Sequence, residues 1–209
     1  MARMLPEPSA TQPVRPLSAK RVGGDFYLRT AVDCAIEFLG KVLVRRAAGG
    51  RVAGVIRDVE AYPAFVDEVH HGNKRTSRTA VMWEAGGVAY VYLVYGMWHQ
   101  FAAVVNHADV PDVVFIRGVV PVEGVELMAA QWDKPRAVSD LANSPGKLCK
   151  SFQITKDLYG ADLTGNELFL EDWGISVDPA DIHMTKRVGI SARHDGHDAA
   201  LRYHLTPRR

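Results

Sequence analysis

The sequence has little cysteine and no long hydrophobic run. Its two cysteines, Cys34 and Cys149, lie far apart and outside any C-x-x-C pattern, so we expect free thiols in a reducing, cytoplasmic location. The longest strongly apolar stretch, Val88–Tyr95, has the length of a strand and is too short to span a membrane. Residues 1–24 are rich in proline and lack the apolar segment of a secretory signal. We therefore expect a flexible N-terminal arm over residues 1–24 and one domain over residues 25–209.

The sequence also lacks an overall excess of one charge, because its formal net charge is +1. The distribution is uneven: residues 1–80 carry a net charge of +5, residues 81–180 carry −7, and residues 181–209 carry +3. A nucleic-acid partner needs only a local positive surface, since phosphate groups are neutralised locally. Charge alone does not decide the matter, because similar fluctuations occur along chains that bind no nucleic acid.

A few helices are expected between the strands. Thr30–Asp33 has the capping-box pattern of a helix start, and Gly40 is placed to end that helix. Ser144 followed by proline predicts another start, with Ser144 as the N-cap. A third helix is expected over Glu123–Trp132. Val32, Ala35, Ile36 and Leu39 have helical spacing in the first of these helices, and Leu148 and Phe152 are expected to face the core from the second.

Short β-branched and aromatic segments, separated by turn residues, predict more strands than helices. We expect residues 63–80 to form mostly loop. The pattern predicts an α+β fold, a single domain with a curved antiparallel β-sheet flanked by helices and a protruding β-hairpin. The expected strands are Lys41–Arg45, Val52–Tyr62, Val88–Tyr95, Gln100–Asn106, Val113–Arg117, Glu167–Glu171, Arg187–Ser191 and Leu201–Leu205.

Two segments are suited to chemistry on a flat, aromatic substrate. Glu60 and Tyr62 end an expected strand, where a rigid element would hold a general base beside a loop that admits substrate. A solvated surface glutamate is the alternative for Glu60. The segment from Tyr90 to Trp98 holds three tyrosines, a turn glycine, Met97 and Trp98. Tyr90 and Tyr92 should share one strand face. Such side chains suit base stacking or insertion into a base step, or alternatively core packing.

Charged and histidine-rich residues fill the intervening loop. Asp67, Glu68, His70 and His71 contain metal-ligand types, but adjacent histidines point in different directions and no third cluster has ligand spacing. We therefore expect no metal there, and a histidine near a glutamate can instead hydrogen-bond a base. The residues suited to phosphate oxygens, with a solvated loop as the alternative, are Lys74, Arg75, Thr76, Ser77, Arg78 and Thr79.

Taken in order, these segments give a family resemblance. The chain resembles the alkyladenine (3-methyladenine) DNA glycosylases of the mammalian type, from about Phe26 to Leu205. No single motif carries the resemblance, which depends on their order and spacing. The matching stretches are Phe38–Val44, Val59–Tyr62, Asp67 with His71, Thr76 with Arg78, Tyr90–Met97, Arg117 with Pro121–Gly124, Pro145–Cys149 and Arg187–Ile190.

The resemblance implies a role for each matching residue. Glu60 would activate the attacking water, and Arg117 would help to hold that water. The substrate-binding residues would be Tyr62, His71, Tyr92 and Ala102, and the DNA-binding residues Tyr95, Met97, Trp98, Arg75, Thr76, Arg78 and Lys147, with Tyr95 filling the gap left in the duplex. The family implies no metal and no organic cofactor, a monomer, and double-stranded DNA containing damaged purines as partner. Such a protein would be nucleoid-associated in a bacterium and nuclear in a eukaryote.

The sequence departs from the family pattern at the expected pocket. Ala102 replaces an asparagine that in the family is thought to block the 2-amino group of guanine. Alanine would remove that obstacle, so guanine lesions are expected to be accepted better than by a typical member. Trp98-His99-Gln100, Thr79, Ser144 and Gly118-Val119-Val120 also depart from the usual residues.

The implied reaction is base-excision repair by a monofunctional N-glycosyl hydrolase. Breaking the N-glycosidic bond builds positive charge on the sugar, which a carboxylate stabilises, and damaged pairs are easier to unstack. No lysine lies within the Glu60–Tyr62 motif or the aromatic hairpin, so a Schiff-base step is not indicated. Two other classes stay open: a catalytically weak DNA-damage-binding protein on the same fold, and a metal hydrolase built on Asp67, Glu68, His70 and His71.

Overall fold

A computed structural model of the chain describes residues 15–47, 49–65 and 68–205. Within them, all paired strands run antiparallel in a sheet of order β1-β7-β2-β3-β6-β5-β4, and β9 pairs with both β3 and β8. This confirms the predicted α+β class. The strands are β1 (Lys20–Arg21), β2 (Val42–Ala47), β3 (Gly50–Tyr62), β4 (Ala89–Val94), β5 (Trp98–Val104), β6 (Val113–Glu123), β7 (Leu168–Asp172), β8 (Ile182–Thr185) and β9 (Arg202–Leu205).

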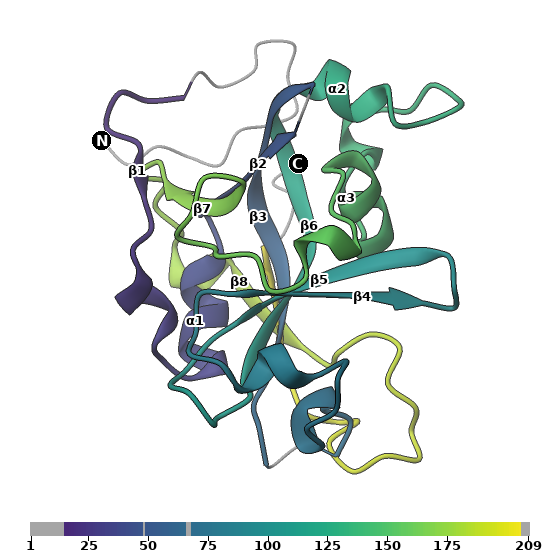
Figure 1. Ribbon diagram of the computed structural model, residues 1–209. Coiled ribbons are helices and arrows are strands. Elements are labelled where there is room, and N and C mark those ends of the chain that lie inside the picture. The colour runs from purple at the N-terminus through teal and green to yellow at the C-terminus, as the bar shows by residue number, and fades with distance from the viewer. Residues whose placement is uncertain (1–14, 48, 66–67, 206–209) are drawn as a thin grey trace.

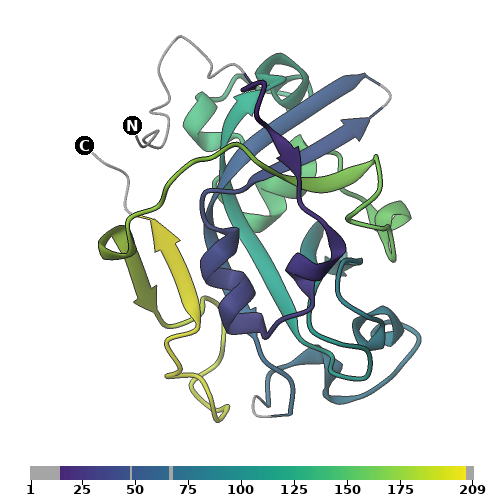
Figure 2. The same ribbon diagram turned by 90° about the vertical axis from the view of Figure 1, so that its left-hand side faces the viewer.

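Three α-helices pack beside the central strands. Helix α1 (Ala31–Phe38) lies on one side of β3 and β6, and α2 (Val125–Ala129) and α3 (Pro145–Ser151) lie on the other (Figures 1 and 2). The β4–β5 hairpin extends sideways from this core, as predicted (Figure 1). No helix in the described ranges is long and apolar enough to cross a membrane.

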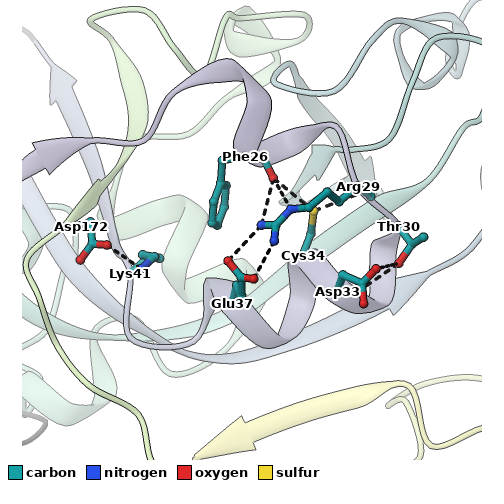
Figure 3. Close-up of polar contacts among 8 residues, drawn as sticks. All are labelled: Phe26, Arg29, Thr30, Asp33, Cys34, Glu37, Lys41 and Asp172. Carbon is teal, nitrogen blue, oxygen red and sulfur yellow. Dashed lines mark hydrogen bonds and ion pairs between the residues drawn. The ribbon is translucent and has the colours of Figure 1, made fainter.

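The start of α1 follows its sequence signal. The Thr30 side chain accepts a hydrogen bond from the Asp33 N–H (Figure 3). Gly40 follows the helix with φ of +82°. An ion pair from Arg29 to Glu37 spans its exposed side. Of the residues with helical spacing, Ala35 and Leu39 are buried and Ile36 is exposed. The buried residues of α1 are Ala31, Cys34, Ala35 and Phe38.

The two central strands, β3 and β6, each extend beyond one end of the range predicted from the sequence. β6 continues past Arg117 to Glu123, because its valines pack in the hydrophobic core on both faces of the sheet. Val119 belongs to one core cluster, and Val120 and Val122 pack in another. This leaves only Val125–Ala129 for the helix predicted over Glu123–Trp132. Gly124 makes the turn between them with φ of +71°, where an added Cβ would lie 2.3 Å from the Arg51 carbonyl oxygen. Helix α3 begins at Pro145 as predicted, although Ser144 makes no side-chain cap, and Leu148 and Phe152 are buried as expected.

Part of the predicted arm is ordered against the sheet. Lys20 and Arg21 form β1 and pair with Asp172 and Glu171 of β7, and Val22 is buried. Residues 20–22, which fall within the segment expected to form an arm, therefore lie against the sheet. The pairing extends the sheet by one edge strand, at the end opposite the hairpin. Residues 1–14 lie outside the described part of the chain.

Candidate active site

Glu60 lies two residues before the end of β3 and is fully buried. Its Oε1 accepts a hydrogen bond of 2.8 Å from the Val188 N–H and lies 3.0 Å from Arg117 Nη1. Its Oε2 accepts a hydrogen bond of 3.0 Å from the Tyr62 hydroxyl. A solvated surface glutamate, the alternative left open by the sequence, is therefore wrong. The structure does bring Glu60 and Arg117 together.

Burial changes the acid–base behaviour of this carboxyl. It raises the pKa of Glu60 above its ordinary value, since the charged form loses hydration. The charge of Arg117 and the hydrogen bonds from Val188 and Tyr62 oppose the rise without cancelling it, and Asp58 adds to it. A carboxylate that is more basic than usual and held by fixed donors is suited to accept a proton from water.

An aromatic cavity of about 440 Å³ opens beside this carboxylate. Tyr62 and Val188, which both bond Glu60, are part of its wall. The volume falls within the range of small-molecule pockets. The four residues predicted to bind substrate all line it, namely Tyr62, His71, Tyr92 and Ala102.

Two tyrosines and a histidine form one side of the cavity. The rings of Tyr90 and Tyr92 stack with centroids 4.8 Å apart, so they share a strand face as predicted. The imidazole of His71 meets Tyr92 edge-on at 5.1 Å, and its Nδ1 lies 3.2 Å from the Tyr90 hydroxyl. Burial and the nearby Arg78 lower the pKa of His71, which favours the neutral imidazole. Tyr90 is 1% exposed, so it also serves the core packing that was the alternative for these tyrosines.

Ala102 lies in the wall between two aromatic residues. It pairs with Tyr90 on β4 and with Phe115 on β6, and it is 1% exposed. Asn106, four residues later, is turned away from the cavity wall, because its side chain bonds Asp112 and its φ is +73°. Among the described residues, the cavity lining includes no asparagine or glutamine side chain.

A loop predicted as a strand closes another side of the cavity. Arg187–Ser191 forms turns instead of a strand, with φ of +83° at Gly189. Its β-branched residues have no neighbouring strand to pair with, because β9 already occupies the edge of β3. The chain from 186 to 201 thus loops beside the segment that follows β3 (Figure 1). In this loop the Arg187 guanidinium lies 4.5 Å above the Tyr62 ring.

The hairpin tip carries the predicted DNA-contacting side chains. Tyr95 is 89% exposed with φ of +51°, and Met97 is 71% exposed. Trp98 is 40% exposed and packs against Gly146 of α3, where an added Cβ would lie 3.0 Å from the indole ring. Solvent-exposed apolar residues at a protruding tip indicate an interaction surface, and core packing of Tyr95 is excluded.

Three basic residues and Thr76, all predicted to bind DNA, lie in the loop at residues 75–78 and on α3. The guanidinium of Arg78 lies 5.3 Å from the Tyr92 ring centre, and Arg75 lies 3.9 Å from Asp109. Thr76 bonds Thr79, which stabilises the local turn. Lys147 on α3 is ion-paired with Asp140. Arg78 is thus the one of these four that the structure brings to the aromatic cavity.

The histidines of the loop do not converge. His70 Nδ1 accepts a hydrogen bond of 2.7 Å from the Gly72 N–H, whereas His71 faces Tyr90. Asp67, part of the alternative metal site, lies outside the described residues. Among those described, no group of three or more histidine, cysteine, aspartate or glutamate side chains is placed to hold a metal ion.

The chain matches known proteins over most of its length. Residues 25–209 match the family model described as methylpurine-DNA glycosylase. A Desulfitobacterium hafniense protein is 39% identical over 89% of this chain and 95% of its own length. A Clostridium perfringens protein is 34% identical over 88% and 95%, and a Methanocella arvoryzae protein 42% identical over 71% and 75%. Each bears the name "Putative 3-methyladenine DNA glycosylase".

The family model covers well over half of the sequence, so the chain belongs to the methylpurine-DNA glycosylase family. This confirms the predicted resemblance. The family and the relatives' names support a role in DNA repair.

Proposed function

We propose that this protein is a base-excision-repair glycosylase that flips an alkylated or damaged purine out of double-stranded DNA and hydrolyses its N-glycosidic bond with water activated by Glu60. The observation that carries the proposal is the pairing of a buried, basic carboxylate with an aromatic cavity through Tyr62 and Val188. The relatives' names support 3-methyladenine as one released base.

The cavity would receive the flipped base. Its walls present π-faces on Tyr62 and on the Tyr90–Tyr92 stack, and an N-alkylated purine carries positive charge that such rings attract by about 0.5 to 2 kcal/mol. Neutral His71 can donate or accept one hydrogen bond at the base edge. At the hairpin tip, Tyr95 is exposed enough to fill the gap in the duplex.

In the chemical step, the bond between the sugar carbon and the purine nitrogen breaks, and its electron pair leaves with the base. A cationic alkylpurine departs as a neutral molecule. The water oxygen bonds to the sugar carbon, and Glu60 takes the water proton while its charge stabilises the oxocarbenium-like transition state. Arg117, 3.0 Å from Glu60, would keep the carboxylate ionised and oriented. The cavity lining, within the described chain, includes no lysine, which supports a monofunctional hydrolase.

Because Glu60 has no exposed surface, a water must gain access when DNA binds. The Val188 N–H bond comes from the 186–201 loop, so a small shift of that loop would free Oε1. The same burial favours the alternative, a catalytically weak damage-binding protein on this fold.

A panel of duplexes, each with one lesion, separates the two functions. We expect abasic sites to form in a duplex carrying an alkylated purine, at an unchanged rate in excess chelator. Tight lesion binding with no released base, under single-turnover conditions, would support the binding protein instead. Loss of activity in chelator that added metal restores would support the metal hydrolase.

A further inference from the structure

Behind Glu60 lies a second carboxylate, Asp58, which is held by an arginine from the last strand. Arg202 on β9 donates from Nε to Asp58 Oδ1 at 2.9 Å and from Nη2 to Oδ2 at 2.7 Å, across 144 residues of sequence. In the strand register Arg202 pairs with Glu60, and its side chain reaches diagonally to Asp58. Two parallel charge-assisted bonds fix both partners geometrically.

Arg117 lies between the two carboxylates of β3. Its Nη1 is 3.0 Å from Glu60, and its Nε is 3.8 Å from Asp58 Oδ2. That Nε is buried and has no hydrogen-bond partner in the described part of the chain. The β3–β6 pairing is irregular on both sides of Asp58, which displaces Arg117 from a regular cross-strand position. A small movement of Arg117 would let it bond Asp58 instead of Glu60.

We propose that Arg202 is a positioning residue for Glu60: by occupying both oxygens of Asp58, it prevents Asp58 from drawing Arg117 away from the general base. The inference depends on the proposed function, because it assigns Arg202 a part in that reaction. Arg202 itself touches no reacting atom. Its effect passes through Asp58 and Arg117 to the carboxylate.

The charges around Glu60 determine the direction of the effect. The titratable and charged groups that face it are Asp58 and Tyr62 on β3, Tyr92 on β4, Arg117 on β6, Arg202 on β9 and Arg187 in the loop beside Tyr62. Without Arg202, Asp58 would be left with Arg117 as its ion-pair partner. The Asp58 side chain is only 16% exposed, so water would compensate little for the lost partner. Glu60 would lose part of the attraction from Arg117 and that of Arg202 itself, so its ionised form would be less favoured.

A purely structural role for Arg202 makes a different prediction. The bond to Asp58 also fastens β9 to β3, so losing it should lower the free energy of unfolding in either case. A structural role would leave the titration of Glu60 unchanged in the folded protein. The pKa at which Glu60 titrates therefore distinguishes a positioning role of Arg202 from a purely structural one.

The experiment compares the full-length wild type with Arg202→Gln, Arg202→Lys and, as matched control, Arg57→Gln. Arg57 is a neighbouring arginine of β3 that contacts the β9 backbone at Leu205 and neither carboxylate. Carbon-13 NMR follows the Glu60 side-chain carboxyl through a pH titration, with Glu60→Gln identifying the signal. Single-turnover release of methylated bases from duplex DNA treated with a methylating agent gives the pH profile of catalysis.

We expect Arg202→Gln to move the Glu60 titration to higher pH and to slow base release at pH 6 roughly tenfold, with a much smaller effect at pH 8. Arg202→Lys should restore part of the shift, because it keeps the charge but not the forked geometry. Arg57→Gln should change neither. In an Asp58→Asn background, Arg202→Gln should have a much smaller effect, since nothing then competes for Arg117.

An unchanged Glu60 titration in folded Arg202→Gln would overturn the proposal, as would a shift of equal size in the Asp58→Asn background. A wild type that releases no base while its Glu60 titration still depends on Arg202 would refute the proposed function and leave the positioning network supported. If Arg202→Gln does not fold, Arg202→Lys and the double variant supply the same comparison.

Discussion

Two buried glutamates on different strands of the sheet illustrate two uses of a carboxylate. Glu60 on β3 is bonded by one guanidinium, one hydroxyl and one backbone N–H. Glu171 on β7 is bonded by the guanidinium groups of Arg15 and Arg51 and by the indole N–H of Trp173. Both are almost fully buried, at 0% and 3% exposure. Burial alone would therefore raise both pKa values.

The two pKa values nevertheless move in opposite directions. Burial of Glu171 opposes its ionisation, but its bonds from Arg51, Arg15 and Trp173 outweigh that effect and lower its pKa to about 2. At Glu60, burial prevails over Arg117 and the other donors, and Asp58 adds repulsion. A second guanidinium binds Glu171, whereas the second guanidinium near Glu60 is bound to Asp58. The stronger burial effect at Glu60 and the second guanidinium bound to Glu171 thus separate the carboxylate with a raised pKa from the one with a lowered pKa.

The largest expected effect is on chemistry at Glu60. Glu60→Gln should slow base release by about 10²- to 10⁴-fold, because a neutral amide accepts no proton from water. Lesion binding should be largely unchanged, since the cavity walls remain. Single-turnover release and gel-shift titration measure the two quantities. Near-normal turnover in this variant would remove Glu60 from the mechanism, and Glu171→Gln, on β7 and outside the cavity lining, serves as the control.

The second effect concerns stability at Glu171. Glu171→Gln should lower the free energy of unfolding by about 2 to 3 kcal/mol, since it leaves Arg51 partly buried beside a neutral group. Because the folded-state pKa of Glu171 is below its unfolded value, its contribution is present above about pH 4.3 and is lost as the pH falls toward 2. Denaturant titrations between pH 7 and 2.5 test this. Glu167→Gln, at an exposed carboxylate, is the matched control, and an equal loss in both would contradict the account.

A third, smaller effect is expected at the hairpin tip. Tyr95→Ala should weaken binding to lesion-containing duplex by about 1 to 3 kcal/mol, the size of a stacking contact, and leave stability unchanged because the side chain is exposed. Fluorescence anisotropy on duplex and single-stranded lesions measures this difference. Leu93→Ala, on the hairpin but away from the tip, should have little effect. Equal weakening on both substrates would show that Tyr95 does not act in the duplex.

The smallest effect concerns lesion choice. Ala102→Asn should shift release from 3-methylguanine toward 3-methyladenine by about fivefold, because the amide would oppose a 2-amino group at a cost of roughly 1 kcal/mol. Ala102→Val adds bulk without an amide and controls for size. The ratio of the two released bases, measured by chromatography, is the readout. An unchanged ratio in Ala102→Asn would mean that this wall does not contact the purine 2-position.

The sequence predicted what local pattern determines. The β-branched run of β3, the alternation of Tyr90 and Tyr92, the cap of α1 and the start of α3 at Pro145 depend on near neighbours and were found close to their expected places. The cavity lining was predicted by resemblance and lies together in the fold. What each of these residues contributes to binding or catalysis stays a prediction.

Distant contacts could not be predicted. The bond from Arg202 to Asp58 joins positions 144 residues apart, and nothing in the sequence near Asp58 indicates it. Arg187–Ser191 has strand-like residues, but whether they pair depends on which strand occupies the edge of β3. The pKa of Glu60 likewise results from burial under the loop that carries Val188, which the isolated motif does not reveal.

The most direct test of the account is the stability of Glu60→Gln as a function of pH. Because the folded-state pKa of Glu60 is raised, its favourable contribution holds below its unfolded pKa and is lost as pH rises through the folded value. We therefore predict that the stability of wild type relative to Glu60→Gln falls as the pH rises from 4 to 7. A relative stability that stays constant or rises with pH over this range, as we expect for wild type relative to Glu171→Gln, would contradict the claim that Glu60 is held for chemistry and not for folding.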